Sequence, residues 1–210
     1  IDHSGILERV AALPRMCLDG WERGLVWDLP KNFERKREVL ILGMGGSAIG
    51  ADILQGILGS KLKRPLFVNR TYTVPGWVSR ETLVVACSYS GNTEETLSAL
   101  DQAARKGASI AGITSVGKLE TWAHRRGWAA LTIPSGLPPR AALGYLTFAP
   151  LGMGAKLGWF ERDLLDVKGS CRLLEQFILK KLHPSVKQSS YPAKQIALRL
   201  KGRLPILYGA

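Results

Sequence analysis

The chain has 210 residues, of which 46% are hydrophobic and 22% are charged; this composition is typical of a globular protein and excludes a disordered or collagen-like chain. Its three cysteines, Cys17, Cys87 and Cys171, are widely spaced and form no Cys-x-x-Cys pair, which argues against a disulfide framework or a zinc knuckle. Because no apolar run reaches the roughly 18 residues of a membrane-spanning helix and no signal peptide opens the sequence, we expect a cytoplasmic protein without a membrane partner.

The formal net charge is +12, and the basic residues are concentrated towards the end of the sequence. Residues 170–210 contain eight Lys and Arg residues but a single acidic residue, Glu175. Such a stretch can bind nucleic acid or another anion, or it can be the solvated face of helices. We favour the solvated face because Lys and Arg do not alternate regularly with aromatic residues here and no DNA-reading motif accompanies them, and we expect no nucleic-acid partner.

The first part of the chain alternates between expected helices and short, continuously apolar runs. We expect the runs to be strands buried on both faces of a sheet; they are residues 39–42, 66–69, 82–88, 109–114 and 130–134. The expected helices are residues 6–27, as one or two leading helices, and then 47–58, 93–106 and 119–126. Strands and helices in alternation predict an α/β fold, a doubly wound parallel sheet with flanking helices.

After Pro134 the pattern becomes helical. A loop at residues 135–139 precedes three expected helical stretches, at residues 140–157, 163–182 and 193–200. The run Leu204–Tyr208 then predicts a new strand, and its sequence LPILYG is similar to EVLILG at residues 38–43. A second sheet is therefore expected to begin near the end of this chain.

These patterns predict four parts: leading helices (1–36), a first α/β domain (37–158), a helical linker (159–203) and the first strand of a second, truncated domain (204–210). The sequence begins with Ile1 rather than Met, which also indicates a piece of a longer polypeptide. The alternative is a complete protein of one domain in which the last strand joins the first sheet.

Two loops lead from an expected strand into an expected helix. The first is residues 43–50, GMGGSAIG, whose glycines allow a sharp turn and whose helix start favours an anion. The spacing Gly43-x-Gly45-x-x-Ala48 also fits a dinucleotide fingerprint. That fingerprint requires an acidic residue after the next strand, where this chain has Arg70. Since an arginine could bind a ribose 2′-phosphate, an NADP site and a purely structural turn both stay open here.

The second loop, residues 88–95, has the sequence SYSGNTEE. Its three hydroxyls, Ser88, Ser90 and Thr93, lie where backbone N–H groups point outwards at the start of a helix, an arrangement that suits a phosphate dianion. Each hydrogen bond to such a charged group contributes roughly 1.5–3 kcal/mol. The sequence therefore favours a phosphate site at this loop.

Ordinary helix capping is the alternative for the second loop. Asn92 would be the N-cap and Glu95 would complete a capping box. This explains the helix side of the loop, but it gives no role to Ser88 and Ser90 on the strand side. Two loops of this kind in one sheet predict a phosphate site more specifically than either loop alone.

Three motifs together resemble a known family: GMGGSAIG at residues 43–50, CSYSGNTEET at 87–96 and PPRAALGY at 138–145. They look like the bifunctional phosphoglucose/phosphomannose isomerases of the SIS (sugar isomerase) domain superfamily, and the resemblance spans essentially the whole chain. Residues 114–119, TSVGKL, resemble a further family segment that is usually Thr-Ser-Gly-Gly, from which Val116 departs. The family has two SIS lobes, so the resemblance implies a flavodoxin-like three-layer sandwich followed by the first strand of a second lobe.

The resemblance implies an enzyme that interconverts glucose 6-phosphate or mannose 6-phosphate with fructose 6-phosphate through a cis-enediolate. Such chemistry needs a base, a cation or donor for the developing oxyanion, and a grip on the distant phosphate. The residues that match the family's substrate-binding positions are Gly46, Ser47, Ser88, Ser90, Thr93 and Arg140. Arg140 also matches the arginine near the reacting carbons, where its permanent charge stabilises the enediolate; this implies a catalytic role and no need for a metal or a cofactor.

The family's general base, its ring-opening histidine from the neighbouring subunit and its late lysine have no matching positions in residues 1–210. We therefore expect the chain to hold the phosphate-binding half of a sugar-phosphate isomerase, and the resemblance implies a homodimer. One alternative is a non-catalytic SIS module that binds a sugar phosphate for regulation, and another is an NADP-binding Rossmann domain. The segment Pro138-Pro139-Arg140 favours the isomerase, and no helix-turn-helix supports a regulator.

Overall fold

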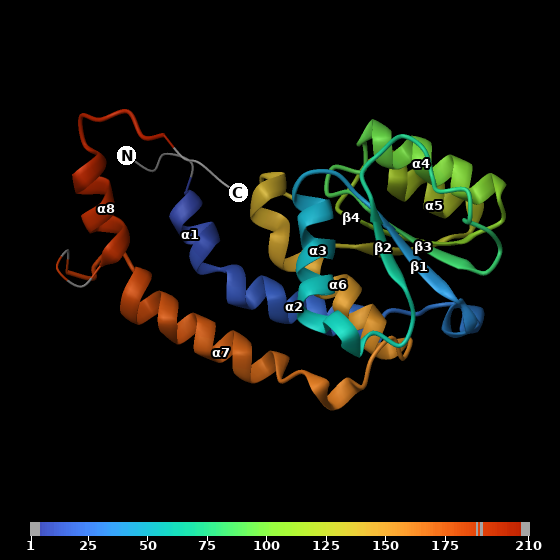
Figure 1. Ribbon diagram of the computed structural model, residues 1–210, viewed down its shortest axis with the longest axis horizontal. Coiled ribbons are helices and arrows are strands. Elements are labelled where there is room, and N and C mark those ends of the chain that lie inside the picture. Colours follow the sequence, from blue (N-terminus) through green and yellow to red (C-terminus); the bar gives the residue numbers. More distant parts are fainter. Residues whose placement is uncertain (1–4, 188, 190, 207–210) are drawn as a thin grey trace.

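The computed structural model describes residues 5–187, 189 and 191–206 (Figure 1). Its centre is a parallel sheet with the strand order β2-β1-β3-β4-β5. The strands are β1 (Glu38–Leu42), β2 (Leu66–Asn69), β3 (Thr82–Cys87), β4 (Ser109–Thr114) and β5 (Ala129–Thr132). All five strands predicted for the first domain are present, and the doubly wound parallel sheet is confirmed.

Helices cover both faces of this sheet, which makes the predicted three-layer sandwich (Figure 1). One face packs against α2 (Leu13–Val26), α3 (Gly46–Leu58) and α6 (Leu143–Lys156). The other face packs against α4 (Glu94–Arg105) and α5 (Lys118–Arg126). Successive strand residues point to opposite faces, so Val39 and Ile41 enter the first core and Leu40 and Leu42 enter the second.

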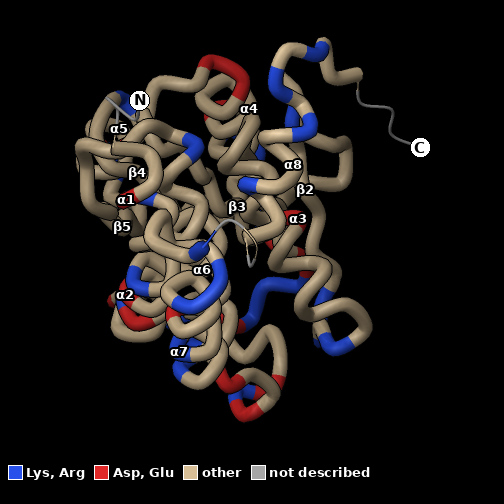
Figure 2. Tube along the Cα trace, turned by 90° about the vertical axis from the view of Figure 1, so that its left-hand side faces the viewer, with Lys and Arg blue, Asp and Glu red and all other residues tan. Residues whose placement is uncertain are grey.

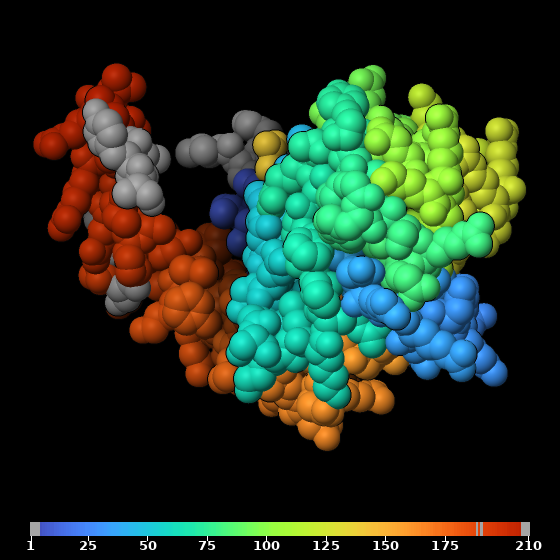
Figure 3. All heavy atoms as spheres, turned by 45° about the vertical axis from the view of Figure 1, so that its right-hand side comes forward, coloured from blue at the N-terminus to red at the C-terminus, as the bar shows by residue number. Residues whose placement is uncertain are grey.

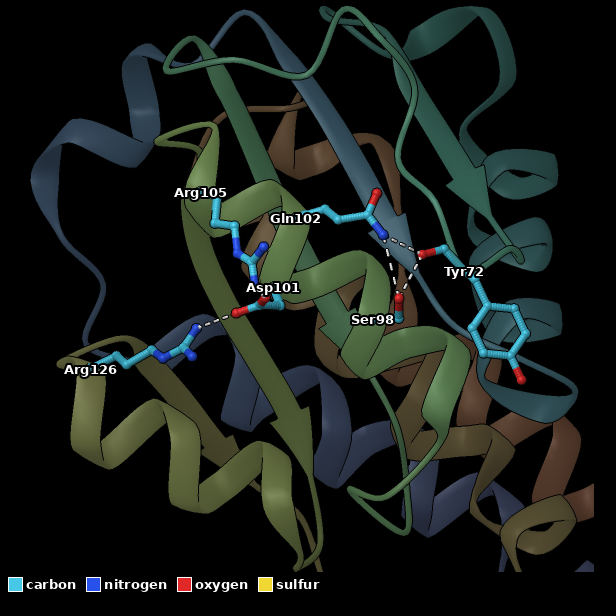
Figure 4. Close-up of polar contacts among 6 residues, drawn as sticks. All are labelled: Tyr72, Ser98, Asp101, Gln102, Arg105 and Arg126. Carbon is cyan, nitrogen blue, oxygen red and sulfur yellow. Dashed lines mark hydrogen bonds and ion pairs between the residues drawn. The ribbon is translucent and has the colours of Figure 1, made fainter.

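Polar contacts hold α4 to its neighbours (Figure 4). The Ser98 hydroxyl and the Gln102 side-chain amide both donate to the backbone carbonyl of Tyr72, at 3.0 and 2.7 Å. The Asp101 carboxylate pairs with Arg126 of α5 at 3.2 Å and with Arg105 of α4 at 2.6 Å. The β2–β3 connection and α5 are thus both tied to the middle and the second half of α4.

The helical parts differ in detail from the predicted stretches. Residues 6–27 form two helices, α1 (Ile6–Ala11) and α2. The stretch 140–157 begins with a 3-10 turn, η3 (Pro139–Ala142), before α6 starts. The stretch 163–182 is three elements: a 3-10 turn η4 (Arg162–Leu164), α7 (Val167–Phe177) and a π-helical turn η5 (Ile178–Leu182). The cause of one break is clear, because the Asp166 carboxylate accepts from the Gly169 N–H at 2.8 Å and starts α7 at Val167.

The last helix, α8 (Pro192–Leu200), stands at one side of the molecule and buries none of its residues (Figure 3). Figure 2 shows Lys and Arg, but no Asp or Glu, along α8 and the residues that follow it. The basic residues at the end of the described chain are therefore exposed or half-buried, and their role as a purely solvated face stays a prediction. None of the helices that the structure describes is long and apolar enough to cross a bilayer.

The predicted strand Leu204–Tyr208 is not seen. Residues 204–206 have no regular structure, and residues 207 and 208 lie outside the described residues. A strand forms only when a second strand supplies hydrogen-bond partners, and in the described residues the sheet has five strands with none added by this segment. Leu204 and Ile206 are consequently 87% and 67% exposed.

Candidate functional site

The two glycine- and serine-rich loops meet where the winding of the sheet reverses. Strands β1 and β3 are neighbours, with Leu42 beside Ala86 near their carboxyl ends. From β1 the chain passes through α3 to β2 on one side, and from β3 it passes through α4 to β4 on the other. The loops after two such strands diverge and leave a crevice in which α/β proteins bind their ligands. The topology thus brings the predicted residues of both loops to one place.

The second loop groups the predicted hydroxyls. The Ser88 and Thr93 side-chain oxygens lie 2.9 Å apart and share a hydrogen bond. Ser88 is buried and Thr93 is half-buried, whereas Ser90 is exposed and its hydroxyl accepts from the Asn92 N–H at 3.3 Å. Two of the hydroxyls therefore satisfy each other at the start of α4, and the third lies at the surface of the same loop.

The capping interpretation of Asn92 is wrong. Helix α4 begins at Glu94 with Thr93 as its N-cap, and no side chain caps it. The Asn92 amide instead donates to the Ser90 carbonyl at 3.0 Å and accepts from the Lys118 N–H at 3.1 Å. The Asn92 side chain therefore connects the second loop to the start of α5 and does not cap the start of α4.

Residues 114–119 clasp the second loop through their backbone. Gly91 has φ +65°, and a Cβ added there would meet the Val116 carbonyl oxygen at 1.8 Å. Gly117 has φ +97°, and a Cβ there would meet the Ser90 carbonyl oxygen at 2.4 Å. Only glycine fits either position. Val116 contributes its carbonyl and leaves its side chain exposed, which explains why a valine is tolerated where the family pattern has glycine.

The first loop lies against the segment that carries Arg140. A Cβ added at Gly46 would lie 3.7 Å from the Pro139 carbonyl oxygen and 3.9 Å from the Arg140 Cα. Ser47 is 8% exposed, and its hydroxyl has no hydrogen bond to any residue that the structure describes. Gly46, Ser47 and Arg140 are therefore brought together from the starts of α3 and η3.

Arg140 is a free cation at this edge of the sheet. Its side chain is exposed, and no carboxylate of the described residues lies within ion-pairing distance of it. Arg70, the cation on which the nucleotide interpretation rests, is already engaged in an ion pair with Asp52 of α3. The contrast favours an anion beside Arg140 and disfavours a ribose phosphate held by Arg70.

Other titratable groups around the loops offer little acid–base chemistry. Burial raises the pKa of the Cys87 thiol to about 12, so it stays protonated near neutral pH and is no nucleophile. The carboxylate of Glu95, followed by burial and by Glu94, raises the pKa of Tyr72. No group of three His, Cys, Asp or Glu residues that could hold a metal ion occurs in residues 5–187, 189 and 191–206.

Sequence analysis did not predict the contacts of three residues that build the site. Ser115 donates to the Tyr89 carbonyl, Tyr89 contacts the segment before Arg140, and Asn92 contacts α5. Their partners lie 26 or more positions away in the sequence, so no local pattern identifies them. The six predicted site residues lie in adjoining loops, and their individual roles stay predictions.

Comparison with known proteins agrees with this architecture. The model of the SIS domain matches residues 32–124. A bifunctional phosphoglucose/phosphomannose isomerase from Caldicellulosiruptor bescii is 41% identical over 204 residues, which cover 97% of this chain and 60% of that protein. A protein of the same name from Aquifex aeolicus is 34% identical over 193 residues, covering 91% of this chain and 56% of the relative. The chain thus spans little more than half the length of these curated relatives.

Solved structures show the same fold. The C-terminal domain of glucosamine-fructose-6-phosphate aminotransferase from Francisella tularensis superposes with a TM-score of 0.64 at 16% identity. The match covers 85% of this chain and 56% of that one. At this identity the similarity concerns the arrangement of strands and helices, and it confirms the SIS-type sandwich.

Proposed function

Since the chain carries a SIS domain and is a relative of the bifunctional phosphoglucose/phosphomannose isomerases, we propose that the whole protein interconverts glucose 6-phosphate or mannose 6-phosphate with fructose 6-phosphate. The chain described here would supply the phosphate grip and the cation of the active site. We also propose that the protein works in the cytoplasm as a homodimer, an assembly that size-exclusion chromatography with light scattering would test.

One observation carries this proposal: a hydroxyl-rich loop follows one strand of the switch point, and Arg140, which has no ion pair among the described residues, lies beside the loop that follows the other. The loop offers Ser88, Ser90 and Thr93 at the start of α4, where the helix dipole favours a dianion. Arg140 stands beside Gly46 at the start of the neighbouring helix. A sugar phosphate that bridges the two would have its phosphate at one end and its reacting carbons at the other.

The division of labour follows from the chemistry of the aldose–ketose step. A proton moves between C1 and C2, and negative charge develops on the oxygens of the enediolate. A guanidinium keeps its charge at every physiological pH, so Arg140 would stabilise that oxyanion throughout the step. Holding the distant phosphate supplies binding energy that orients the reacting carbons. The chain's own residues would thus bind, orient and stabilise charge.

Calorimetric titration with fructose 6-phosphate tests the grip directly. We expect saturable binding, no detectable binding of fructose, and a weakening of at least tenfold for Ser88→Ala or Thr93→Ala, because each loses a hydrogen bond to a charged group. Ser98→Ala is the matched control: it removes a serine hydroxyl too, but one within α4 that donates to the Tyr72 carbonyl. Unchanged affinity in both loop variants would refute the assignment of the loop.

A coupled assay with fructose 6-phosphate tests the other half of the proposal. We expect these 210 residues to bind the sugar phosphate without turning it over. Turnover would require a base among the residues of this chain and would overturn our division of labour. Binding without turnover would support a phosphate grip that needs groups from elsewhere in the protein.

A further inference from the structure

Tyr89 lies between the predicted phosphate ligands Ser88 and Ser90, yet its side chain turns away from them. It is 6% exposed. The phenolic hydroxyl donates to the Pro134 carbonyl at 3.0 Å and accepts from the Leu137 N–H at 2.8 Å. One buried hydroxyl thus uses both its donor and an acceptor on a segment more than forty residues further along the chain.

That segment leads to Arg140; Leu137 packs against the core, but the segment has few hydrogen bonds. Residues 134–138 have no regular structure, and Gly136 has φ +85°. Within the described part of the chain, the hydrogen bonds of residues 134–137 go to the Tyr89 hydroxyl alone. The next turn, η3, begins at Pro139 and carries Arg140. The path from β5 to Arg140 is therefore anchored midway by Tyr89.

The other end of Tyr89 is fixed as well. Its backbone carbonyl accepts from the Ser115 hydroxyl at 2.6 Å and from the Ser115 N–H at 3.1 Å. The preceding residue, Ser88, donates its N–H to Ile113 at the end of β4. A rigid ring joins the two ends, so the distance between the hydroxyl loop and the Pro134–Leu137 segment is set by the length of one tyrosine side chain.

We propose that Tyr89 is a positioning residue, which sets the place of Arg140 relative to the phosphate-binding loop. This rests on the proposed function, in which the loop holds the phosphate and Arg140 faces the reacting carbons. A phosphate bound between Ser88 and Thr93 and a guanidinium fixed through the Tyr89 hydroxyl then stand at a constant separation. The distance between the phosphate-binding hydroxyls and the Arg140 guanidinium would thereby match the length of one sugar phosphate.

Two probes separate positioning from a merely structural role. Inorganic phosphate reports the loop alone. Arabinonate 5-phosphate reports the loop and Arg140 together, because its carboxylate imitates the charge of the enediolate. Tyr89→Phe keeps the ring and the backbone carbonyl held by Ser115 but removes both hydrogen bonds to the Arg140 segment. We expect its affinity for arabinonate 5-phosphate to fall about tenfold, while that for inorganic phosphate stays within about twofold.

The double variant tests the coupling. Arg140→Ala should also lower the affinity for arabinonate 5-phosphate about tenfold. The variant that combines Tyr89→Phe with Arg140→Ala should bind it as tightly as Arg140→Ala alone, since the effects of residues that act through one another are not additive. Tyr145→Phe is the matched control, because it removes another buried phenol, whose pKa is raised by burial and by Asp19 of α2, and it should keep wild-type affinity for both probes.

Each failure has its own signature. A wild-type chain that binds neither probe would overturn the proposed function and the inference with it. A wild-type chain that binds both, with Tyr89→Phe equal to it or equally weakened for both probes, would overturn the inference alone. Should Tyr89→Phe fail to fold, hydrogen exchange at the Leu137 amide of the unchanged chain decides: we expect protection that rises further with arabinonate 5-phosphate, and exchange at the unprotected rate would overturn the proposal.

Discussion

The two loops at the switch point are built in opposite ways. The second loop, whose residues 88–93 precede α4, is held by side chains and backbone from residues 114–119, and its Gly91 has no room for a single added carbon. The first loop, residues 43–47, receives no side-chain hydrogen bond from the described residues, and a Cβ at Gly46 would meet only ordinary contacts. One loop is preorganised and the other keeps space open.

This difference fits two tasks. A site that grips a dianion gains affinity when its donors are fixed before the ligand arrives. A loop that lies beside the variable part of a ligand needs room for the backbone to come close, which glycine provides. The two glycine-containing loops look alike in sequence, but the second is rigid and the first leaves space for a ligand. Substitutions can test this difference.

The largest effect is expected from a carbon added to each loop. Gly91→Ala places a side chain at φ +65° and against the Val116 carbonyl, and it should cost about 3 kcal/mol or more of the free energy of unfolding. Gly46→Ala should change that free energy by less than about 0.5 kcal/mol but weaken the binding of fructose 6-phosphate. Urea denaturation of both variants gives the comparison, and equal stabilities would remove the distinction between the loops.

The second effect concerns the tie between the second loop and α5. Asn92→Ala loses the hydrogen bonds to the Ser90 carbonyl and the Lys118 N–H, and we expect a loss of about 1–2 kcal/mol in the free energy of unfolding. Asn69→Ala is the matched control. Asn69 is the last residue of β2 and lies outside the two loops, and its side-chain amide also makes two hydrogen bonds to backbone, to the carbonyls of Thr71 and Thr73. Faster hydrogen exchange at the Lys118 amide should accompany Asn92→Ala and be absent from Asn69→Ala.

Alkaline pH should weaken the strand before the second loop. Burial raises the pKa of Cys87 from 9.0 to about 12, so between these values the unfolded chain loses a proton that the folded chain retains. The stabilisation is complete below pH 9 and disappears as the pH approaches 12, at about 1.4 kcal/mol per pH unit for one group. Denaturation at pH 8, 9 and 10 should show a shallower fall for Cys87→Ala, and an unchanged slope would contradict the assignment to Cys87.

The smallest effect on stability is expected at Ser47 of the first loop. Its hydroxyl has no hydrogen-bond partner among the described residues, so Ser47→Ala should leave the melting temperature within about 1 °C. The affinity for fructose 6-phosphate should nevertheless fall, because the substitution removes a hydroxyl that we predict to bind the substrate. A lower melting temperature with unchanged affinity would assign Ser47 to the scaffold.

Much of the fold could be predicted because buried parallel strands are continuously apolar. The boundaries of β2 and β4 coincide with the expected runs 66–69 and 109–114. The helix boundaries were less accurate where a local contact interrupts the apolar pattern, as at Asp166. The strand expected at residues 204–208 depends on a partner strand, and a hydrophobic run by itself does not supply one.

The grouping of the site residues could be predicted from the sequence, but the contacts that hold them in place could not. The clustering of Ser88 with Thr93, and of Gly46 with Arg140, follows from motifs that stand at strand ends. The roles of Tyr89 and Asn92 do not, because their partners are 45 and 26 positions away in the sequence. Asn92 even carries a misleading local signal, since an asparagine before a helix usually caps it. Local pattern identifies the residues that face a ligand more readily than those that hold them.

The hydrogen bond between Ser88 and Thr93 has a consequence for selectivity. At 2.9 Å the two hydroxyls already satisfy each other, so a ligand must offer more than the contact that it replaces. A neutral hydroxyl of an unphosphorylated sugar exchanges one such bond for another of similar strength, whereas a phosphate dianion forms charge-assisted bonds that are roughly twice as strong. If the loop binds the phosphate as proposed, the Ser88–Thr93 contact sets a threshold that phosphorylated sugars exceed and free sugars do not.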